Sequence, residues 1–549
     1  MDIIAKLTKE LALKQDQVER TVALLDEGNT VPFIARYRKE VTGSLDDTIL
    51  RTLEERLTYL RSLERRREEV RAAILAQDKM TPEIEAALEG ASILTEIEDI
   101  YRPFKQKRRT RASVARERGL EPLAALLAEQ KNVYTPNLPT QAAAFISEEK
   151  GVTSAEEALA GACDILAEDI SDNAAYRREI RRLTYRDGLI KTAGAQEQDS
   201  VYAMYYDYSE RVNRIPDHRI LAINRGEKEG FLRVSLALSG DAPLSFLTSQ
   251  VITNDRSPAK EFLVPTVADA YTRLIAPSIE NEIRTQLFDR ASEGAISNFA
   301  VNLKHLLMQS PLKNFTVMGY DPGYRTGCKL AVVDSTGRVL DTAVIYPTKP
   351  QERIAESKRT VKALIKRYAV DAIAIGNGTA SKESEIFIAE TLSELAAEHI
   401  ACKYIVVSEA GASVYSASKL GAEEFPDYDV TQRSAVSIAR RLQDPLAELV
   451  KIDPKSIGVG QYQHDMKEAR LDEALTGVVE DCVNAVGVDV NTASYSLLSY
   501  IAGINAASAK NIVKYREENG AFTSRAQIKK VPRIGAKAFE QCAGFLRIP

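Results

Sequence analysis

The sequence predicts a multidomain protein that is predominantly helical and contains one α/β domain. Its 549 residues are enough for roughly three or four domains of ~150 residues each. Apolar residues recur at helical spacing over the first third of the chain and again near its end, whereas a stretch after residue 313 shows the alternation of strands. Hydrophobic residues make up 44% of the chain, which supports several packed cores and excludes a wholly disordered protein.

Composition narrows the class of protein. The 73 basic and 78 acidic side chains give a net charge of −5, which alone would not indicate a nucleic-acid partner. The five cysteines lie far apart without a C-x-x-C pair, so we expect no disulfide framework, no structural zinc site and a reducing, cytoplasmic location. The charged N-terminus does not resemble a signal peptide, and without 18 consecutive apolar residues we expect no membrane span.

No motif of cofactor or metal chemistry stands out. The four histidines lie in four different segments without ligand spacing, and the chain contains no G-x-x-x-x-G-K-[ST] loop. We therefore expect no cofactor, no metal ion and no ATPase activity.

Residues 1–195 should form a helical region. Gly28 is placed to end the second helix, and Ser44 is a candidate N-cap for a long charged helix from Asp46 to about Ala76. The first two helices are consistent with a helix-turn-helix, and a plain helical hairpin is an equally good interpretation.

Residues 196–312 should form a small β insert followed by helix. Four tyrosines cluster at its start, and the run from Phe231 to Leu236 alternates in the manner of a strand. Helical spacing returns from about Ala259 to Leu307.

Residues 313–440 should form the α/β domain. The expected order is three consecutive strands, then helix, strand, helix, strand and helix. Such an antiparallel start followed by crossover helices gives a mixed sheet with a ribonuclease-H-like arrangement. The expected strands are Phe315–Asp321, Cys328–Asp334, Val339–Tyr346, Asp371–Ile375 and Lys403–Ser408. A helical segment, 441–480, should connect this domain to the tail.

The tail, 481–549, should carry tandem helix-hairpin-helix elements. It holds nine Lys/Arg and five Asp/Glu, a local charge of 9 − 5 = +4. Two short turns, Ile501–Asn505 and Val531–Gly535, each lie between helical runs. Such a turn directs backbone N–H groups at the start of the next helix toward an anion, so we predict binding of nucleic-acid phosphates without sequence preference. The candidate contact residues are Gly503, Ile504, Asn505, Lys510, Lys530, Arg533, Gly535 and Lys537.

A second basic segment runs from Arg102 to Arg118, with eight basic residues and one acid. Its centre supplies four further candidate contacts, Lys107, Arg108, Arg109 and Arg111. A solvated surface and a site for nucleic acid or an acidic partner are both consistent with this pattern.

The α/β domain carries too few acids for a two-metal nuclease, which needs several carboxylates around two cations. Asp321 ends the first strand and Glu409 follows the last one, but Gly376–Thr379 offers no acid and the closing helix has none between Thr431 and Arg440. We therefore interpret Asp321 and Glu409 as a vestigial active site in a non-enzymatic domain. The alternative is a metal-dependent, RuvC-like nuclease that uses these two residues.

The chain resembles the bacterial Tex family of transcription accessory proteins from end to end. The motifs that carry the resemblance are Gly28–Glu40, Lys107–Arg111, Asn224–Glu229, Gly319–Gly323, Ile457–Asp465 and Val479–Gly487. The resemblance implies an N-terminal helix-turn-helix, a YqgF-type ribonuclease-H-like domain that is not an active nuclease, and tandem helix-hairpin-helix elements.

The resemblance also implies sequence-independent binding of RNA and DNA, with the transcription machinery as a partner. Members of the family continue into an OB-fold RNA-binding domain, which we expect this chain to lack. A third interpretation is a protein-interaction scaffold whose basic residues contact acidic partners.

Overall fold

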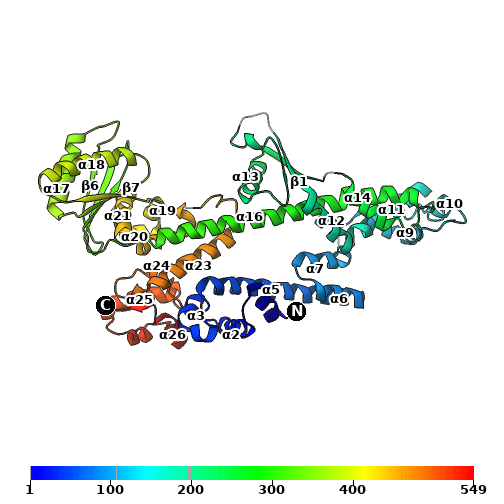
Figure 1. Cartoon of the computed structure of the whole chain (residues 1–549), viewed down its shortest axis with the longest axis horizontal. Coiled ribbons are helices and arrows are strands. Elements are labelled where there is room, and N and C mark those ends of the chain that lie inside the picture. The colour runs from blue at the N-terminus through cyan, green and yellow to red at the C-terminus, as the bar shows by residue number, and fades with distance from the viewer. Residues whose placement is uncertain (1, 107, 196–199, 239, 459, 549) are drawn as a thin grey trace. The chain divides into compact units, whose positions relative to one another are not determined.

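The computed structural model describes residues 2–106, 108–195, 200–238, 240–458 and 460–548 (Figure 1). The chain divides into two compact units. Unit 1 comprises Met1–Ala12 and Leu53–Gly294, and unit 2 comprises Leu13–Thr52 and Ala295–Pro549. The boundary between Thr52 and Leu53 lies inside the long helix α5 (Asp47–Leu75), and the boundary between Gly294 and Ala295 lies inside the long helix α16 (Ala276–Leu307).

Unit 1 is built mainly of helices. They are α1 (Ile3–Leu11), α6 (Pro82–Gly90), α7 (Leu94–Tyr101), α8 (Arg111–Glu117), α9 (Glu121–Ala128), α10 (Leu138–Ala143), α11 (Ala155–Asp172), α12 (Ala174–Asp187), α13 (Asp217–Lys228), α14 (Ala242–Val251) and α15 (Lys260–Asp269). A π-helical turn, Ala270–Ile275, joins α15 to α16. One apolar core gathers α8, α9, α11 and α15 around Leu120, Leu127 and Ile165.

A three-stranded antiparallel sheet interrupts these helices. Its order is β2 (Asp207–Arg211), β1 (Gly188–Gly194), β3 (Leu232–Leu238), with β1 in the centre. The prediction of helix up to residue 195 was therefore wrong over β1. The physical reason is a change of period: Ile190 and Thr192 are buried while Lys191 and Ala193 are exposed, an alternation that the preceding arginine-rich helix obscured.

The ends of two N-terminal helices can be compared with their predicted signals. Gly28, at φ +76°, follows α2 (Gln15–Asp26) and its N–H donates to the Leu25 carbonyl oxygen, which confirms it as a helix stop. Ser44 is not the cap of α5. It follows α4 (Lys39–Thr42) at φ +65°, and the Asp46 carboxylate instead accepts from the Ile49 N–H at 2.8 Å.

Unit 2 contains the predicted mixed sheet, in the order β6-β5-β4-β7-β8. The strands are β4 (Val317–Asp321), β5 (Cys328–Val333), β6 (Val339–Ile345), β7 (Ala372–Gly376) and β8 (Lys403–Val407). β4, β5 and β6 pair antiparallel, whereas β4, β7 and β8 run parallel. The ribonuclease-H-like arrangement is confirmed.

Helices cover both faces of this sheet. α17 (Ile354–Tyr368) and α18 (Ser381–Ala397) pack on one face through Val361 and Phe387, and α21 (Val430–Gln443) packs on the other through Ala435 (Figure 1). Gly319 permits the close approach of α21, because a Cβ there would lie 2.0 Å from the Ala435 carbonyl oxygen.

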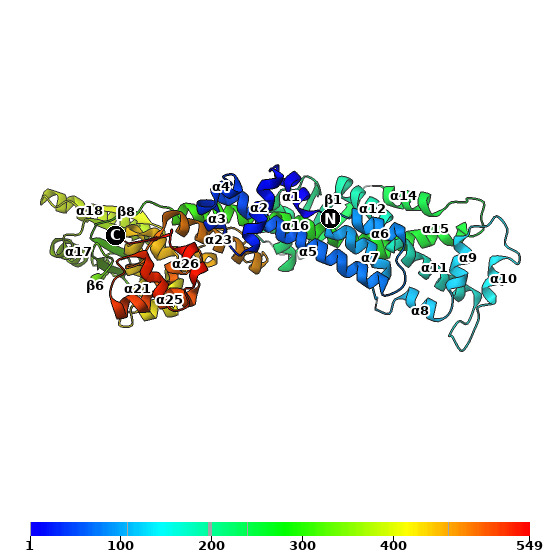
Figure 2. The same ribbon diagram turned by 90° about the horizontal axis from the view of Figure 1, so that it is seen from below.

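The remainder of unit 2 is mainly helical, with one short parallel pair of strands, β9 (Val488–Asp489) and β10 (Leu546–Arg547), and most of it shares one large core. Its elements are α3 (Val31–Tyr37), α19 (Ala412–Ala417), α20 (Lys419–Glu424), α22 (Pro445–Leu449), α23 (Glu468–Val486), α24 (Tyr495–Leu498), α25 (Ala506–Asn519), the 3₁₀ helix η5 (Arg525–Lys530) and α26 (Ala536–Cys542). α25 and α26 lie close together (Figure 2). Within the described ranges, no helix is both long and apolar enough to cross a bilayer.

Candidate nucleic-acid interface

The first predicted turn closes a hairpin between α24 and α25, here called hairpin 1 (residues 495–519). Ile501 and Ile504 are buried, and the Ile504 N–H donates to the Ile501 carbonyl oxygen at 2.9 Å. Gly503 takes φ +77°, a left-handed backbone conformation that residues other than glycine and asparagine rarely adopt. Asn505 is the N-cap of α25, and its side-chain oxygen accepts from the Ser508 N–H at 2.9 Å.

The second turn repeats this geometry between η5 and α26, here called hairpin 2 (residues 525–542). The Ile534 N–H donates to the Val531 carbonyl oxygen at 3.2 Å, and both side chains are buried. The left-handed position, φ +67°, is occupied by Arg533 rather than by glycine. Gly535 is the N-cap of α26 at φ −80°, and a Cβ added there would meet no atom within 4 Å.

Direct hydrogen bonds hold the two hairpins side by side. The buried Ser508 hydroxyl donates to the Arg533 carbonyl oxygen at 3.3 Å, and the Asn511 amide donates to the Pro532 carbonyl oxygen at 2.9 Å. From α23, the buried Asn484 accepts from the Ala502 N–H at 3.0 Å and donates to the Tyr500 carbonyl oxygen at 2.8 Å. Both turns are thus fixed relative to each other within unit 2.

The starts of α25 and α26 supply the N–H groups that an anion needs. In α25 the Ser508 N–H is capped and the Ala509 N–H bonds to the Asn505 carbonyl oxygen, which leaves the N–H groups of Ala506 and Ala507 without an intrahelical acceptor. Both residues lie at the surface. The N-terminal end of a helix also carries positive dipole potential, which favours negative charge.

The predicted cations of the two hairpins differ in the contacts that they make. Lys530 and Arg533 are exposed and form no ion pair among the described residues. Lys510 lies 5.2 Å from the centre of the Tyr495 ring, and Lys537 donates to the Glu27 carbonyl oxygen. The Ile504 side chain is 5% exposed and belongs to the core.

In the other predicted basic segment, several side chains form ion pairs within unit 1. Arg102 pairs with Asp172 at 3.1 Å, Arg116 with Glu168 at 2.6 Å, and Arg118 with Glu157 at 2.9 Å. Lys107 lies outside the described residues. Arg108, Arg109 and Arg111 are exposed, and Arg109 is 3.9 Å from Glu117.

The structure brings Asp321 and Glu409 together at the end of the mixed sheet. Burial raises the pKa of Asp321 to about 6; a hydrogen bond with Ser434 opposes this shift, the nearby Glu409 adds to it, and Lys329 opposes it. Glycines make room for the Glu409 carboxylate: a Cβ at Gly378 would lie 1.7 Å from its Oε1. A proton is therefore held more firmly at Asp321 than at an ordinary aspartate.

Basic groups share this end of the sheet. The buried Arg441 donates to the carbonyl oxygens of Ser408 and Ala410, at 2.9 and 2.7 Å. Burial lowers its pKa to about 10, against the effect of the Glu448 and Glu409 carboxylates. No group of three or more His, Cys, Asp or Glu side chains suited to a metal ion occurs in the part of the chain that the structure describes.

Comparison with family models assigns these parts. Residues 1–75 match the Tex-like protein N-terminal domain, 135–299 the Tex central region-like model, 315–443 the Tex protein YqgF-like domain, and 483–547 the helix-hairpin-helix motif. "Protein tex" of Bordetella pertussis is 48% identical over 564 residues, which cover 100% of this chain and 70% of that protein. The chain belongs to the Tex family.

Two further relatives match over a similar extent. "Uncharacterized protein YdcI" of Bacillus subtilis is 51% identical, with 99% of this chain and 75% of that protein covered. "Transcriptional accessory protein Tex" of Neisseria gonorrhoeae is 47% identical, with 100% of this chain and 72% of that protein covered.

Two structural features of the Tex tail escaped sequence reasoning. Asn484 fixes the turn of hairpin 1 although it lies in the helix before the hairpin. No local sequence pattern indicates that this side chain bonds to a turn 18 residues away. Arg533 was noted as a cation, whereas its left-handed backbone was not. Placing the two turns in register, Ile501 on Val531, aligns Gly503 with Arg533 and is the signal that could have revealed it.

Proposed function

We propose that this Tex-family chain is a non-enzymatic factor that binds RNA and DNA through their phosphate backbones without sequence preference. The observation that carries the proposal is the paired geometry of hairpins 1 and 2. Each leads into a helix that starts at the surface, and the exposed Lys530 and Arg533 of hairpin 2 have no ion-pair partner among the described residues. Such groups recognise phosphate, which every nucleotide carries, and not the bases.

The first test is fluorescence anisotropy with labelled duplex DNA and single-stranded RNA over a range of salt concentrations. We expect the logarithm of the binding constant to fall linearly with the logarithm of salt concentration, at a slope worth several phosphate contacts. Absence of binding even at low salt would contradict the proposal and favour a protein-interaction scaffold.

A substitution at the cap of hairpin 1 tests the contact itself. Asn505→Asp keeps the side-chain oxygen that accepts from Ser508 and adds a negative charge where phosphate should lie. We expect about tenfold weaker binding, or ~1.4 kcal/mol, with unchanged thermal stability because aspartate is an equally good N-cap. Asn505→Ser is the matched neutral control and should bind nearly as the parent does. Equal binding by all three chains would show that phosphate does not approach hairpin 1.

The YqgF-like domain is proposed to serve as a scaffold without nuclease activity. The predicted pair Asp321 and Glu409 lies at its sheet end with the cations Lys329 and Arg441 beside it, and no group of three or more His, Cys, Asp or Glu side chains suited to a metal ion occurs among the described residues. A two-metal reaction needs more carboxylate charge than this to hold two cations ~3.5–4 Å apart.

The nuclease alternative is tested by incubating branched and linear DNA and RNA with Mg²⁺ or Mn²⁺. We expect no cleavage above that of a mock preparation. Cleavage by the parent chain that Asp321→Asn abolishes would establish the nuclease and overturn the scaffold proposal. Cleavage that survives Asp321→Asn would point to a contaminant.

Association with the transcription machinery is proposed from the similarity to the Neisseria gonorrhoeae relative, which is named a transcriptional accessory protein. The test is retention of purified RNA polymerase by the immobilised chain, with and without nuclease treatment. Retention that survives the treatment indicates a protein contact, and retention that disappears indicates a nucleic-acid bridge. No retention in either condition would contradict this part of the proposal.

A further inference from the structure

We propose that unit 1 carries a second nucleic-acid-binding surface, formed by the outer side of α12 and the open face of the β2-β1-β3 sheet, and that it takes single-stranded nucleic acid. This surface, the basic track, comprises Arg178, Arg182, Tyr185 and Arg186 of α12, Lys191 of β1, Arg211 of β2 and Arg233 of β3. The inference rests on the proposed function, but it concerns a different unit from the hairpins.

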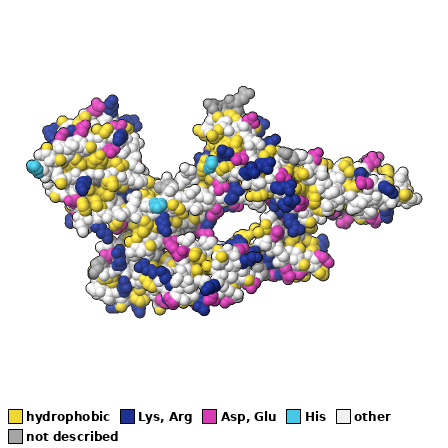
Figure 3. All heavy atoms as spheres, viewed as in Figure 1, with side chains coloured by type: hydrophobic (Ala, Val, Ile, Leu, Met, Phe, Trp, Pro, Cys, Tyr) yellow, Lys and Arg dark blue, Asp and Glu magenta, His cyan; other side chains and the backbone are white. Residues whose placement is uncertain are grey.

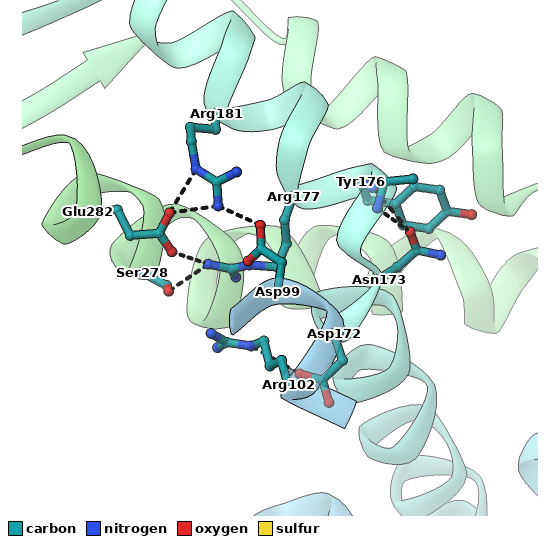
Figure 4. Close-up of polar contacts among 10 residues, drawn as sticks. Asp99, Arg102, Asp172, Asn173, Tyr176, Arg177, Arg181, Ser278 and Glu282 are labelled. Carbon is teal, nitrogen blue, oxygen red and sulfur yellow. Dashed lines mark hydrogen bonds and ion pairs between the residues drawn. The ribbon is translucent and has the colours of Figure 1, made fainter. Parts of the chain in front are cut away.

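A buried ion network fixes the inner side of α12 (Figure 4). Arg177 donates to Asp99 at 2.8 Å and pairs with Glu282, and Arg181 donates to the same two carboxylates at 2.8 Å each. Burial disfavours the charged form of Arg181, but Asp99 and Glu282 outweigh it and raise the pKa of this side chain. The helix is therefore held by α7 and α16 without using its outer arginines.

The outer side of α12 presents a stripe of arginines with an aromatic ring among them. Arg178, Arg182 and Arg186 are spaced four residues apart, and Tyr185 lies seven residues after Arg178, so all four share one face. All are exposed, Tyr185 at 43%. Figure 3 shows Lys and Arg side chains gathered over α12 and the adjoining end of β1.

The sheet continues this surface with a face that has no helix on it among the described residues. Along β1 the side chains of Ile190 and Thr192 are buried, and those of Lys191 and Ala193 are exposed. Strand register places the exposed Arg211 opposite Leu189 and the exposed Arg233 opposite Ala193. The other members of the face are small or polar: Ser209, Ser235, Ala237 and Asp207.

The three cations of the sheet form a diagonal row. Arg211, Lys191 and Arg233 lie on neighbouring strands, each two residues further along than the last. Diagonal neighbours of this kind are ~7–8 Å apart, so the row spans about 15 Å. One strand of a nucleic acid carries a phosphate for every ~3.4 Å of its axis, so three cations over this span can each meet a phosphate of one strand.

The helix stripe and the sheet row are electrostatically joined at Asp187. A hydrogen bond from Arg186 lowers the pKa of Asp187, and Arg211 and Arg182 act in the same direction. The Asn213 amide also ties the strand end to α12 by donating to the Arg186 carbonyl oxygen at 3.2 Å. Three acids accompany the six cations of the track: Glu179 pairs with Arg182 at 2.5 Å, Asp187 pairs with Arg186 at 2.5 Å, and Asp207 lies on the sheet face. The net charge is 6 − 3 = +3.

These properties favour a single strand over a duplex or an acidic protein. A polyanion compensates the excess positive charge, and an exposed tyrosine among arginines offers a base a surface for stacking. A duplex keeps its bases stacked on each other and would leave Tyr185 unused.

The test compares two variants of the full chain in anisotropy with single-stranded RNA. The first, Lys191→Ser with Arg211→Ser and Arg233→Ser, removes the diagonal row. The second, Lys79→Ser with Lys150→Ser and Arg256→Ser, removes the same charge from exposed loops of unit 1. Since each phosphate contact contributes about 0.7 to the salt slope for single strands, we expect the first variant to bind at least tenfold more weakly with a slope lower by about 2, and the control to match the parent.

A second measurement locates the strand directly. A 4-thiouridine RNA should cross-link under ultraviolet light to the segment 178–191, and Tyr185→Ser should reduce that yield while the loop control with Lys79→Ser, Lys150→Ser and Arg256→Ser leaves it unchanged. If the row variant binds and cross-links as the parent does while Asn505→Asp loses binding, the basic track is wrong and the hairpin proposal stands. If the parent binds no nucleic acid at all, both fail.

Discussion

Hairpins 1 and 2 have the same backbone geometry, but they place different residues at the left-handed position and at the N-cap. Hairpin 1 has glycine at the left-handed position and asparagine at the cap, whereas hairpin 2 has arginine at the left-handed position and glycine at the cap. A left-handed conformation costs a residue with a side chain about 1–2 kcal/mol, and a glycine cap gives up a few tenths relative to a capping side chain.

The difference indicates that the two hairpins contribute differently to stability and to binding. Hairpin 1 satisfies its backbone locally and is held by Asn484 and Ser508. Hairpin 2 accepts strain at Arg533 and leaves the start of α26 uncovered at Gly535, with open space around it. We infer that hairpin 1 contributes more to folding of the tail and that hairpin 2 offers phosphate a less obstructed approach.

The largest expected effect comes from placing the same residue at both glycines. Gly503→Ser should lower the free energy of unfolding of the tail by about 2 kcal/mol, because it forces a side chain into φ +77° and brings its Cβ within 2.9 Å of the Ala538 carbonyl oxygen. Gly535→Ser should leave stability unchanged or raise it by a few tenths, since serine is a good cap. Amide hydrogen exchange in α25 and α26 measures the stability change of each variant. Equal losses of stability in the two variants would contradict the inferred difference between the hairpins.

Charge at the cap of hairpin 2 should change affinity without changing stability. Gly535→Asp supplies a capping side chain and a negative charge at the start of α26, so we expect about tenfold weaker binding of duplex DNA at low salt. Gly535→Asn caps equally well without the charge and is the matched control. If the two variants bind alike, phosphate does not contact this helix start.

Much of this architecture was accessible from the sequence. The strands of the mixed sheet were located because each is a short apolar run bounded by turns, and Gly28 because a glycine after an apolar stripe has one common role. β1 was missed because helical arginines run directly into it, and Ser44 was mistaken for a cap because Asp46, two residues on, has the same chemistry.

Less of the candidate site could be predicted from the sequence, because several of its contacts join residues that are distant in the chain. The turns could be found because their residues are adjacent in the sequence. The ties from Asn484 and Ser508, the proximity of Glu409 to Asp321 and the diagonal of Arg211, Lys191 and Arg233 join residues distant in the chain, and only register and packing bring them together.

Arg533 should show opposite effects on stability and binding. Arg533→Asn places a residue that tolerates the left-handed region there, so we expect ~0.5–1 kcal/mol of added stability with about threefold weaker binding, because one cation is lost. Arg533→Lys keeps both the charge and the strain and should change neither by much. A more stable Asn variant with full affinity would show that Arg533 is not a phosphate contact.

The contact between the hairpins should give the smallest effect. The Ser508 hydroxyl is buried and donates to the Arg533 carbonyl oxygen at 3.3 Å, a long bond to a neutral acceptor. Ser508→Ala should therefore cost only ~0.5–1 kcal/mol, and the opening of α25 and α26 should become less coupled. Hydrogen exchange resolves this: in the parent the amides of both helices should open together, and in the variant those of α26 should open first. The order follows from the asymmetry of the two turns, because α26 has neither a capping side chain nor a relaxed left-handed residue before it. If α25 opened first instead, hairpin 1 would be the weaker of the two, and the assignment of folding to hairpin 1 and of phosphate approach to hairpin 2 would have to be reversed.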